Sequence, residues 1–423
     1  MRVLVPLAGL AFLVAQPQPP LQPQPPLPPP FATPSVTKHP KVIGWPAGKT
    51  PKAPDGFAVT LYAEGFDSPR WLYVLPNGDV LVAEARTLPA KDADPDTKKG
   101  LAESKTGTGG SGNRITLLRG ADEDGKPEVR ETFLTGLKQP LGMALVGAHL
   151  YVANTDSVVR FPHTAGATKL TAAGTPVVYL PLGGYNNHWT RNLLAKPDGS
   201  KLYISVGSAS NVGEKGMKEE ALRANILEAN PDGTGLRVFA AGLRNPVGMA
   251  WEPKTGLLWT AVNERDELGD DLVPDYITSV RDGAFYGWPF AYFGPNEDPR
   301  RKGERPDLVA KTVPPDLSVG AHTASLGLCF GTSPTFPEKY RGGAFVGQRG
   351  SWNRSQFAGY RVAFVPFRDG RPVGPPEDFL TGFIATDSEV YGRPVCVCVA
   401  ADGALLVTDD VTNRIWRVAP VTR

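Results

Sequence analysis

One phrase recurs six times along this chain, and it constrains the fold more than any other feature. Each copy has a polar start, an alternating apolar run, a turn, a second apolar run and a polar tip. The copies are "SPRWLYVLPNGDVLVAEA" (68–85), "QPLGMALVGAHLYVANT" (139–155), "TRNLLAKPDGSKLYISVGS" (190–208), "NPVGMAWEPKTGLLWTAVNE" (245–264), "ASLGLCFGTSPTFPEKYRGGAFVGQRG" (324–350) and "RPVCVCVAADGALLVTDD" (393–410). Turns such as PNGD and PDGS between β-rich runs are typical of β-hairpins. The sequence therefore predicts six hairpins.

Further strand candidates follow the hairpins. They include "RITLLRG", "SVVRFP", "YRVAFVPF" and "NRIWRV". Radial repetition of such units predicts an all-β fold, a six-bladed β-propeller of four-stranded antiparallel blades over residues 50–423. No long amphipathic helix pattern competes with it. We expect the long intervals 86–113 and about 265–323 to be loop excursions on one propeller face, where loops commonly carry function.

The first 49 residues precede the repeat. "MRVLVPLAGLAFLVAQ" has an early arginine and an apolar run, which predicts a signal peptide over residues 1–15; the alternative is a buried strand. Residues 16–49 open with "QPQPPLQPQPPLPPP", which predicts an extended proline-rich tether. No later run has the length of a membrane span. We therefore expect a periplasmic or secreted protein, with a possible tether to the cell envelope.

Charge and cysteine content exclude several functions. The net charge is +2 over 423 residues, so no strong field favours nucleic acid or an anionic membrane. The three cysteines cannot form a complete disulfide framework. Cys396 and Cys398 alternate with valines and should share one face of a strand as buried hydrophobic residues. No C-x-x-C-H motif is present, so the sequence predicts no haem attached to this chain.

A propeller brings the starts and the ends of its hairpins together at one mouth. The expected ends are Glu84, Asn154, Ser208, Asn263 with Glu264, Gln348 with Arg349, and Asp409 with Asp410. The expected starts are Arg70, Gln139, Arg191, Arg244 with Asn245, and Arg393. Because guanidinium groups match flat carboxylates, an arginine-rich rim indicates an anionic ligand.

Several motifs carry a family resemblance. "GYNNHWTRNLLAKPDGSKLYISVGSASN", "GLRNPVGMAWEPKTGLLW", "FYGWP" and "GRPVCVCVAADGALLVTDD" resemble the soluble pyrroloquinoline-quinone (PQQ) dehydrogenases, and the sorbosone dehydrogenase branch more than soluble glucose dehydrogenase. The resemblance spans about residues 50–420. It implies PQQ at the mouth, a calcium ion that positions the quinone, and oxidation of a sugar hydroxyl or hydrated aldehyde. A cytochrome or quinone would accept the electrons.

The resemblance also assigns residues by position. His188 matches the catalytic base; the alternative is a structural histidine that lines the channel. The implied cofactor contacts are Gln139, Asn187, Arg244, Asn245 and Arg393, with Arg349 and Arg354 both matching one further basic position. Main-chain carbonyls of Glu264 and Arg265 match the calcium turn. Trp189, Arg191 and Trp352 are weaker candidates for sugar contacts.

Two departures from the glucose enzymes concern the histidine. Asn187 and Ser208 stand where those enzymes carry acids, so the partner that orients His188 is open. Val395 stands where a second arginine would accompany Arg393.

The residues themselves favour oxidation with a bound cofactor. Alcohol oxidation needs a base and a hydride acceptor; neutral histidine can serve as the base, and no side chain accepts hydride. No Rossmann glycine motif is present. Two alternatives stay open. Glu84, Asn154, Asn263 and Asp409 could cage Ca²⁺ in a propeller lactonase, and the chain could be a non-catalytic exported binding module.

Overall fold

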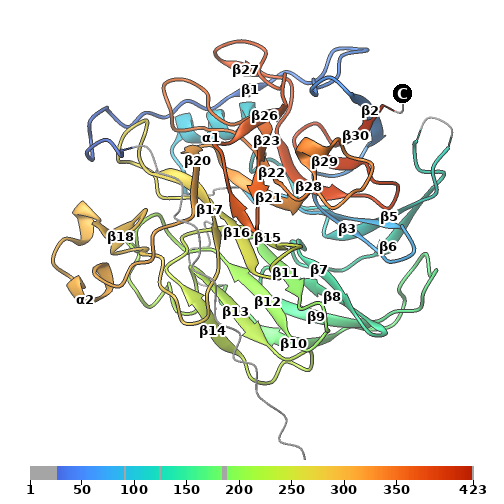
Figure 1. Cartoon of the computed structure of the whole chain (residues 1–423), viewed down its shortest axis with the longest axis horizontal. Coiled ribbons are helices and arrows are strands. Elements are labelled where there is room, and N and C mark those ends of the chain that lie inside the picture. The colour runs from blue at the N-terminus through green and yellow to red at the C-terminus, as the bar shows by residue number, and fades with distance from the viewer. Residues whose placement is uncertain (1–25, 90–91, 123–124, 183–187, 422–423) are drawn as a thin grey trace, which may run out of the picture.

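The computed structural model describes residues 26–89, 92–122, 125–182 and 188–421 of the chain. Six four-stranded antiparallel sheets in this described part form the predicted six-bladed propeller (Figure 1). Blade one contains β3 (Pro69–Val74), β4 (Val80–Glu84), β5 (Arg114–Arg119) and β6 (Val129–Leu134). Blade two contains β7 (Met143–Val146), β8 (His149–Ala153), β9 (Ser157–Pro162) and β10 (Thr175–Tyr179). Blade three contains β11 (Arg191–Ala195), β12 (Leu202–Val206), β13 (Asn225–Ala229) and β14 (Arg237–Ala241). Blades four and five are β15 (Pro246–Trp251), β16 (Leu258–Val262), β17 (Pro274–Ser279) and β20 (Leu317–Ala321); and β21 (Ser325–Phe330), β22 (Ala344–Gln348), β23 (Arg361–Val365) and β26 (Glu377–Leu380).

Blade six joins the two ends of the chain. It contains β28 (Pro394–Val399), β29 (Leu405–Asp409) and β30 (Arg414–Pro420), and its fourth strand is β2 (Phe57–Glu64). The β2–β30 pairing runs antiparallel from Phe57 opposite Pro420 to Glu64 opposite Arg414. The propeller is therefore closed by a strand that precedes the first predicted hairpin.

The six predicted hairpins are confirmed as the first and second strands of the blades. Their turns have the expected chemistry: Gly78 and Gly199 adopt φ angles of 89° and 72°, and their N–H groups close the turns to Leu75 and Lys196 at 2.9 and 2.8 Å. A residue with a side chain would be strained at such φ angles, which explains the glycines. The candidates "RITLLRG", "SVVRFP", "YRVAFVPF" and "NRIWRV" are third strands, as predicted.

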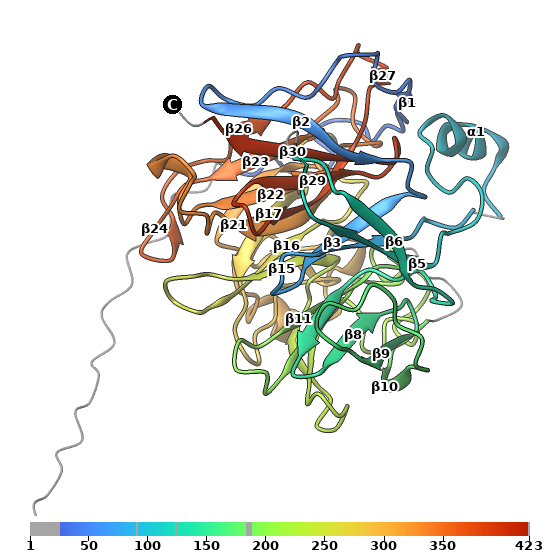
Figure 2. The same cartoon turned by 90° about the vertical axis from the view of Figure 1, so that its right-hand side faces the viewer.

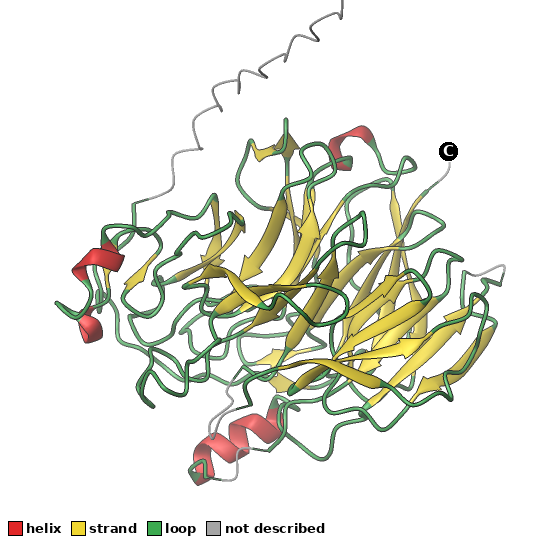
Figure 3. Cartoon of the chain, turned by 90° about the horizontal axis from the view of Figure 1, so that it is seen from below, coloured by secondary structure: helices red, strands yellow, loops and turns green. Residues whose placement is uncertain are grey.

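The two predicted excursions differ from expectation. Residues 86–113 contain a helix, α1 (Pro95–Glu103), whose first turn is capped by the Asp94 side chain. The interval 265–323 is not one loop, because it includes the blade strands β17 and β20. These strands divide it into a shorter loop, 265–273, and a longer excursion, 280–316, which contacts β14 through a parallel bridge between Ala241 and Phe285. Helical segments lie outside the fan of strands (Figure 3).

Small elements complete the described part. They are β18 (Ala291–Tyr292), β19 (Asn296–Glu297), η1 (Pro299–Arg301) and α2 (Pro306–Val309) within 280–316, η2 (Glu338–Tyr340), β24 (Phe367–Arg368), β25 (Arg371–Pro372), and the parallel pair β1 (Lys41–Val42) and β27 (Glu389–Val390). No helix of the described residues is long and apolar enough to cross a membrane.

The described part of the predicted tether lies against the propeller. The Phe31 N–H donates to the Leu268 carbonyl at 2.8 Å, and the Lys38 N–H to the Trp352 carbonyl at 2.7 Å. The buried indole of Trp45 donates to Asp409 at 2.8 Å. Figure 2 shows β1 and β27 at the same end of the molecule as α1. This segment thus crosses blades four, five and six on the face that carries the residues described next.

Apolar side chains fill the space between blades. The second strand of each blade is almost wholly buried, and every residue of β4 and β12 is buried. The three cysteines are free, and burial raises the pKa of each thiol. The prediction that Cys396 and Cys398 pack as hydrophobic residues is confirmed, since both contact the same core.

Candidate active site

The predicted mouth is one end of the propeller, which we call the upper rim: the end at which each second strand finishes. Glu84, Gln348 and Asp409 are the last residues of β4, β22 and β29. Asn154 and Asn263 follow β8 and β16 directly. The register of the blades therefore places the predicted polar ends where expected.

His188 lies three residues before the first residue of β11, Arg191, and its ring is held by blade three. Nδ1 lies 2.9 Å from the Ser208 carbonyl oxygen and 3.0 Å from Ser208 Oγ. The carbonyl can only accept, and Oγ donates its own proton to the Ser210 carbonyl at 2.6 Å. Nδ1 must therefore carry the proton. In the neutral ring this leaves a lone pair on Nε2, which has no hydrogen-bond partner among the described residues.

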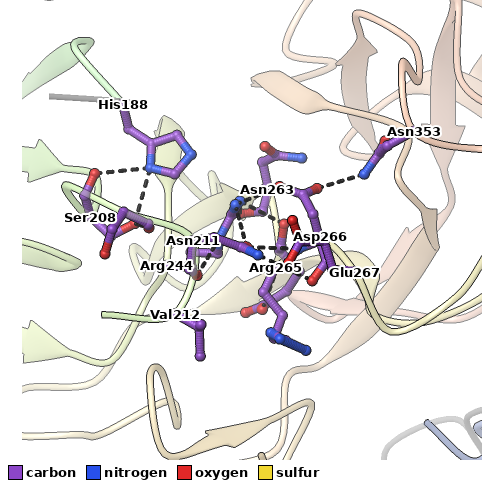
Figure 4. Close-up of polar contacts among 12 residues, drawn as sticks. His188, Ser208, Asn211, Val212, Arg244, Asn263, Arg265, Asp266, Glu267 and Asn353 are labelled. Carbon is purple, nitrogen blue, oxygen red and sulfur yellow. Dashed lines mark hydrogen bonds and ion pairs between the residues drawn. The ribbon is translucent and has the colours of Figure 1, made fainter. Parts of the chain in front are cut away.

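Electrostatics keep this ring neutral. Burial and the nearby Arg244 guanidinium, with smaller effects of Arg223 and Arg191, lower the pKa of His188 well below its usual value. The hydrogen bond to Ser208 opposes this shift. Figure 4 shows the ring on one side and the polar network of Arg244 on the other. A histidine with a fixed tautomer, a free Nε2 and a lowered pKa is suited to accept a proton near neutral pH.

Arg244 is fully engaged with the protein. Its Nε donates to the Asn211 carbonyl at 3.2 Å, and its Nη1 to the carbonyls of Glu264 (2.6 Å) and Asn263 (3.4 Å). Its Nη2 donates to Asn211 Oδ1 and to Asp266 at 3.0 and 2.8 Å. These bonds use all five N–H groups of a guanidinium. A ligand carboxylate would have to displace one of these acceptors.

Asp266 links this network to blade five. Its second carboxylate oxygen accepts from Asn353 at 2.7 Å, and the same amide group lies 3.1 Å from Nδ1 of His322. The Nε2 atom of His322 donates to the Gly269 carbonyl at 2.8 Å. Arg244, beside the cofactor site implied by the resemblance, is thus braced across two blades.

A second cluster combines three arginines with one carboxylate. Arg70 pairs with Asp410, and Arg349 Nε lies 2.9 Å from the same carboxylate. Arg393 donates from Nε to the Arg349 carbonyl at 2.9 Å and from Nη2 to Gly350 at 2.7 Å. We call Arg70, Arg349, Arg393 and Asp410 the rim arginine cluster.

This cluster has unused donors and excess positive charge. Arg70 Nε and Nη2, and Nη1 of both Arg349 and Arg393, have no hydrogen-bond partner among the described residues. Burial lowers the pKa of Arg70 and of Arg393 to about 10. The same three guanidinium groups oppose burial and hold the pKa of Asp410 below its usual value. One carboxylate facing three cations leaves room for an anionic ligand.

The rim arginine cluster continues to the His188 loop through Trp189. The guanidinium of Arg70 lies over the Trp189 ring, 5.6 Å from its centroid. The indole N–H donates to Thr87 at 2.9 Å, and Arg349 Nη2 donates to Thr106 at 3.2 Å. The excursion 86–113 therefore contacts both the histidine loop and the cluster. Trp189 is buried, so its role here is packing around the site.

The other predicted residues occupy distinct places. Gln139 is buried, and its amide donates to the Arg86 carbonyl at 2.9 Å. Arg354 pairs with Asp271 and lines a cavity of about 460 Å³ beside β20 and β23. Trp352 is 40% exposed and stacks on His39 at 5.6 Å. Asn187 lies outside the described residues.

The positions matched to a calcium turn have other partners. The Glu264 carbonyl already accepts from Arg244. Its side chain is buried, which raises the pKa of that carboxyl to about 7. The buried Arg265 guanidinium lies 3.0 Å from Asp298. Within the described residues there is no group of three His, Cys, Asp or Glu that could hold a metal ion.

The four residues of the alternative calcium cage are also engaged locally. Glu84 binds Arg114 through both oxygens, at 2.8 and 2.7 Å. Asn154 accepts from the Lys138 N–H at 3.1 Å, and Asn263 donates to Asp275 at 3.2 Å. Asp409 accepts from Trp45 and from the Arg393 N–H. These contacts assign them to holding the blades together.

Three residues of the site were not predicted as site residues. Arg70 and Asp410 were expected on the rim, but only their pairing across the first and last blades shows what they do. Arg223 lies between β12 and β13 in a run without recognisable turn or metal chemistry.

The architecture places this protein in the class of six-bladed β-propellers. Within that class, residues 51–275 and 300–420 match the model of the TrAA12-like family, and the chain belongs to that family. It is similar to the aldose sugar dehydrogenase YliI of Escherichia coli (strain K12), at 29% identity over 260 residues, which are 60% of this chain and 59% of that protein.

Two solved structures have the same fold. One is the holo form of the pyranose dehydrogenase PQQ domain from Coprinopsis cinerea, with 19% identity, a TM-score of 0.70 and coverage of 89% of this chain and 98% of that chain. The other is the calcium structure of the Trichoderma reesei carbohydrate-active enzyme of family AA12, also 19% identical with a TM-score of 0.70, covering 91% and 98%. The resemblance to PQQ-dependent sugar dehydrogenases that the motifs indicated is confirmed.

Proposed function

We propose that this protein is a PQQ-dependent oxidoreductase that oxidises a sugar hydroxyl or a hydrated aldehyde, with His188 as the base. The observation that carries the proposal is the state of His188: its Nδ1 is committed to Ser208, and its Nε2 is free on the upper rim. The named relatives, one a PQQ domain and one an aldose sugar dehydrogenase, support the cofactor and the substrate class.

The rim arginine cluster fits PQQ. PQQ carries three carboxylates, and the cluster offers unused N–H groups of Arg70, Arg349 and Arg393 around a single protein carboxylate. The resemblance implies a second arginine beside Arg393, but Val395 stands at that position. Arg70 supplies another guanidinium group to the same cluster. When bound, PQQ would supply the two-electron acceptor that no side chain provides.

Calcium fits the described residues less well. The Glu264 carbonyl is occupied by Arg244, and two guanidinium groups, Arg244 and Arg265, stand at that turn. Their charge opposes a divalent cation unless the cofactor itself brings ligands.

The residues of the chain divide the remaining work. His188 Nε2 accepts the hydroxyl proton as the C–H hydrogen leaves with its electron pair. The lowered pKa ensures that Nε2 is unprotonated before the substrate arrives. The exposed Trp352 provides an apolar face at the rim for a sugar ring. A sorbosone-type aldehyde or an aldose suits this arrangement. We further propose an exported protein and an external cytochrome or quinone as the electron acceptor.

Reconstitution tests the proposal. The full chain is titrated with PQQ, with and without Ca²⁺, and dye reduction is followed over a panel of aldoses, sorbosone and simple aldehydes. We expect PQQ-dependent dye reduction in the wild type and its loss in His188→Gln. Metal-dependent lactone hydrolysis without PQQ would instead establish the lactonase, and neither activity would leave a binding module.

A further inference from the structure

We propose that two buried arginines of blade three, Arg223 and Arg191, are positioning residues that hold His188 in its reactive orientation. This inference rests on the proposed function of His188. Ser208 stands where the resemblance leads one to expect an acid, and a serine side chain carries no charge that could orient the imidazole ring of His188. The two guanidinium groups supply both the anchoring and the charge.

Arg223 binds three carbonyls that surround the histidine. Its Nε donates to Gly207 at 3.0 Å, and its Nη2 donates to His188 at 3.1 Å and to Ser208 at 3.2 Å. The Ser208 carbonyl is the same oxygen that accepts from His188 Nδ1. One Nη2 group therefore ties the backbone of the histidine to the acceptor of its ring.

Arg191 also binds backbone carbonyls of the loop that carries His188. Its Nη1 donates to the His188 carbonyl at 2.7 Å and its Nη2 to the Pro181 carbonyl at 2.9 Å. The His188 carbonyl thus accepts from two guanidinium groups, which uses both of its lone pairs. The loop end that carries the histidine is fixed by charge-assisted hydrogen bonds, which are stronger than neutral ones.

The support is itself rigid. Arg191 and Arg223 are 0% and 2% exposed, so moving either would strand a buried charge. The turn that leads to Arg223 is closed by Glu220, which accepts from the N–H groups of Ala209 and Ser210 at 2.7 and 3.0 Å. Ser210 is the residue whose carbonyl fixes the Ser208 hydroxyl. Glu220, Arg223, Ser208 and His188 therefore form one continuous chain of contacts.

The charges around the ring act in one direction. Arg244 from blade four and Arg223 and Arg191 from blade three all disfavour a protonated His188. The carboxylates act further out: Glu220 and Glu219 favour the charged form of Arg223, and Asp156 favours that of Arg191. Removing one arginine should therefore both loosen the ring and let it bind a proton more readily.

The test measures His188 directly, without the cofactor. The chain has five histidines, so a ¹⁵N-histidine-labelled sample is assignable by comparison with His188→Gln. Titration of the apo protein gives the pKa of His188 and its tautomer. We expect Arg223→Gln to raise the pKa of His188 and to weaken the preference for the proton on Nδ1.

Two further variants separate charge from geometry. Arg223→Lys keeps the charge but cannot reach three carbonyls, so the pKa of His188 should stay low while kcat of the reconstituted enzyme falls about 100-fold with KM little changed. Arg237→Gln is the matched control: it lies on β14 of the same blade, exposed and paired with Asp282, and should leave the His188 titration unchanged.

Two outcomes would overturn the inference. One is a folded Arg223→Gln protein whose His188 keeps its titration and tautomer. The other is an Arg223→Lys enzyme with wild-type kcat. If Arg223→Gln does not fold, the lysine variant and Arg191→Lys decide the matter. If His188→Gln keeps full activity, the proposed function fails, whereas the titration still shows whether the arginines position the ring.

Discussion

Two groups of buried arginines stand on the upper rim, and they differ in what their N–H groups do. Arg191, Arg223 and Arg244 donate to backbone carbonyls or to the local network around Asp266. Arg70, Arg349 and Arg393 surround Asp410 and keep N–H groups that have no hydrogen-bond partner among the described residues. The first group binds backbone carbonyls and Asp266 of this protein, and its positive charge disfavours a protonated His188. The second can receive a ligand. Burial and charge alone would not have separated them.

The largest effect should come from the residue that the first group serves. His188→Gln removes the base, so kcat/KM for sugar oxidation should fall about 100- to 10,000-fold. PQQ binding, monitored by absorbance titration, should be unchanged because the rim arginine cluster is intact. A variant with wild-type turnover would contradict the division of roles.

The second group is tested by PQQ affinity. Arg349→Gln removes charge-assisted hydrogen bonds worth about 1.5–3 kcal/mol, so the Kd for PQQ should rise about tenfold to 150-fold. Arg354→Gln is the comparison, because Arg354 pairs with Asp271 and not with Asp410. Weaker binding in Arg354→Gln and normal binding in Arg349→Gln would reverse the assignment.

A smaller effect should follow from crowding the histidine. A methyl group on Gly207 would lie 2.6 Å from His188 Cβ and 2.3 Å from Asn245 Oδ1. Gly207→Ala should therefore cost about 1–3 kcal/mol of unfolding free energy and lower kcat, as thermal melts and dye reduction would show. Gly110→Ala meets nothing within 4 Å and is the control. Equal effects of the two substitutions would show that Gly207 has no special relation to His188.

The smallest effect concerns pH. His188 works unprotonated, and its pKa is lowered below the usual 6.5, so kcat/KM should persist as pH falls through 6.5. Below that pH the unfolded chain binds a proton that the folded ring refuses. The stability contributed by this group therefore decreases as pH falls from 6.5 toward the folded pKa. An acid limb of kcat/KM at or above 6.5 would show that the arginine charges do not reach the ring.

Much of the fold was predictable, because the hairpin of each blade is encoded by residues that are close together in the sequence. PNGD and PDGS fix turns, and alternating runs fix strands, without information from elsewhere in the chain. The fourth strand of blade six was not predictable in this way, since β2 pairs with β30 at the other end of the chain. The blade strands β17 and β20 were lost in a region rich in proline and charge, because burial by neighbouring blades outweighs local propensity there.

The site was predictable where side chains meet the ligand and less so where they meet the backbone. His188 and the rim position of Arg393 came from motifs and register. Arg223 did not, because the acceptors that surround His188 are carbonyl oxygens, which every residue has. The engagement of Arg244 with Asp266 was hidden for a related reason: the two residues are close in space through loops that carry no repeat.

The closure of blade six has a consequence for how the ring comes into being. The strand Phe57–Glu64 can pair only after Arg414–Pro420, far along the chain, has been synthesised, so blade six lacks its fourth strand until then. Contacts between such distant residues form slowly, because the loop between them must first be ordered. Arg70 belongs to blade one and Asp410 follows β29 of blade six, so their ion pair forms only where these two blades meet. The rim arginine cluster is therefore complete only when the propeller is closed. Binding of a polycarboxylate to the cluster would show that blades one and six have come together.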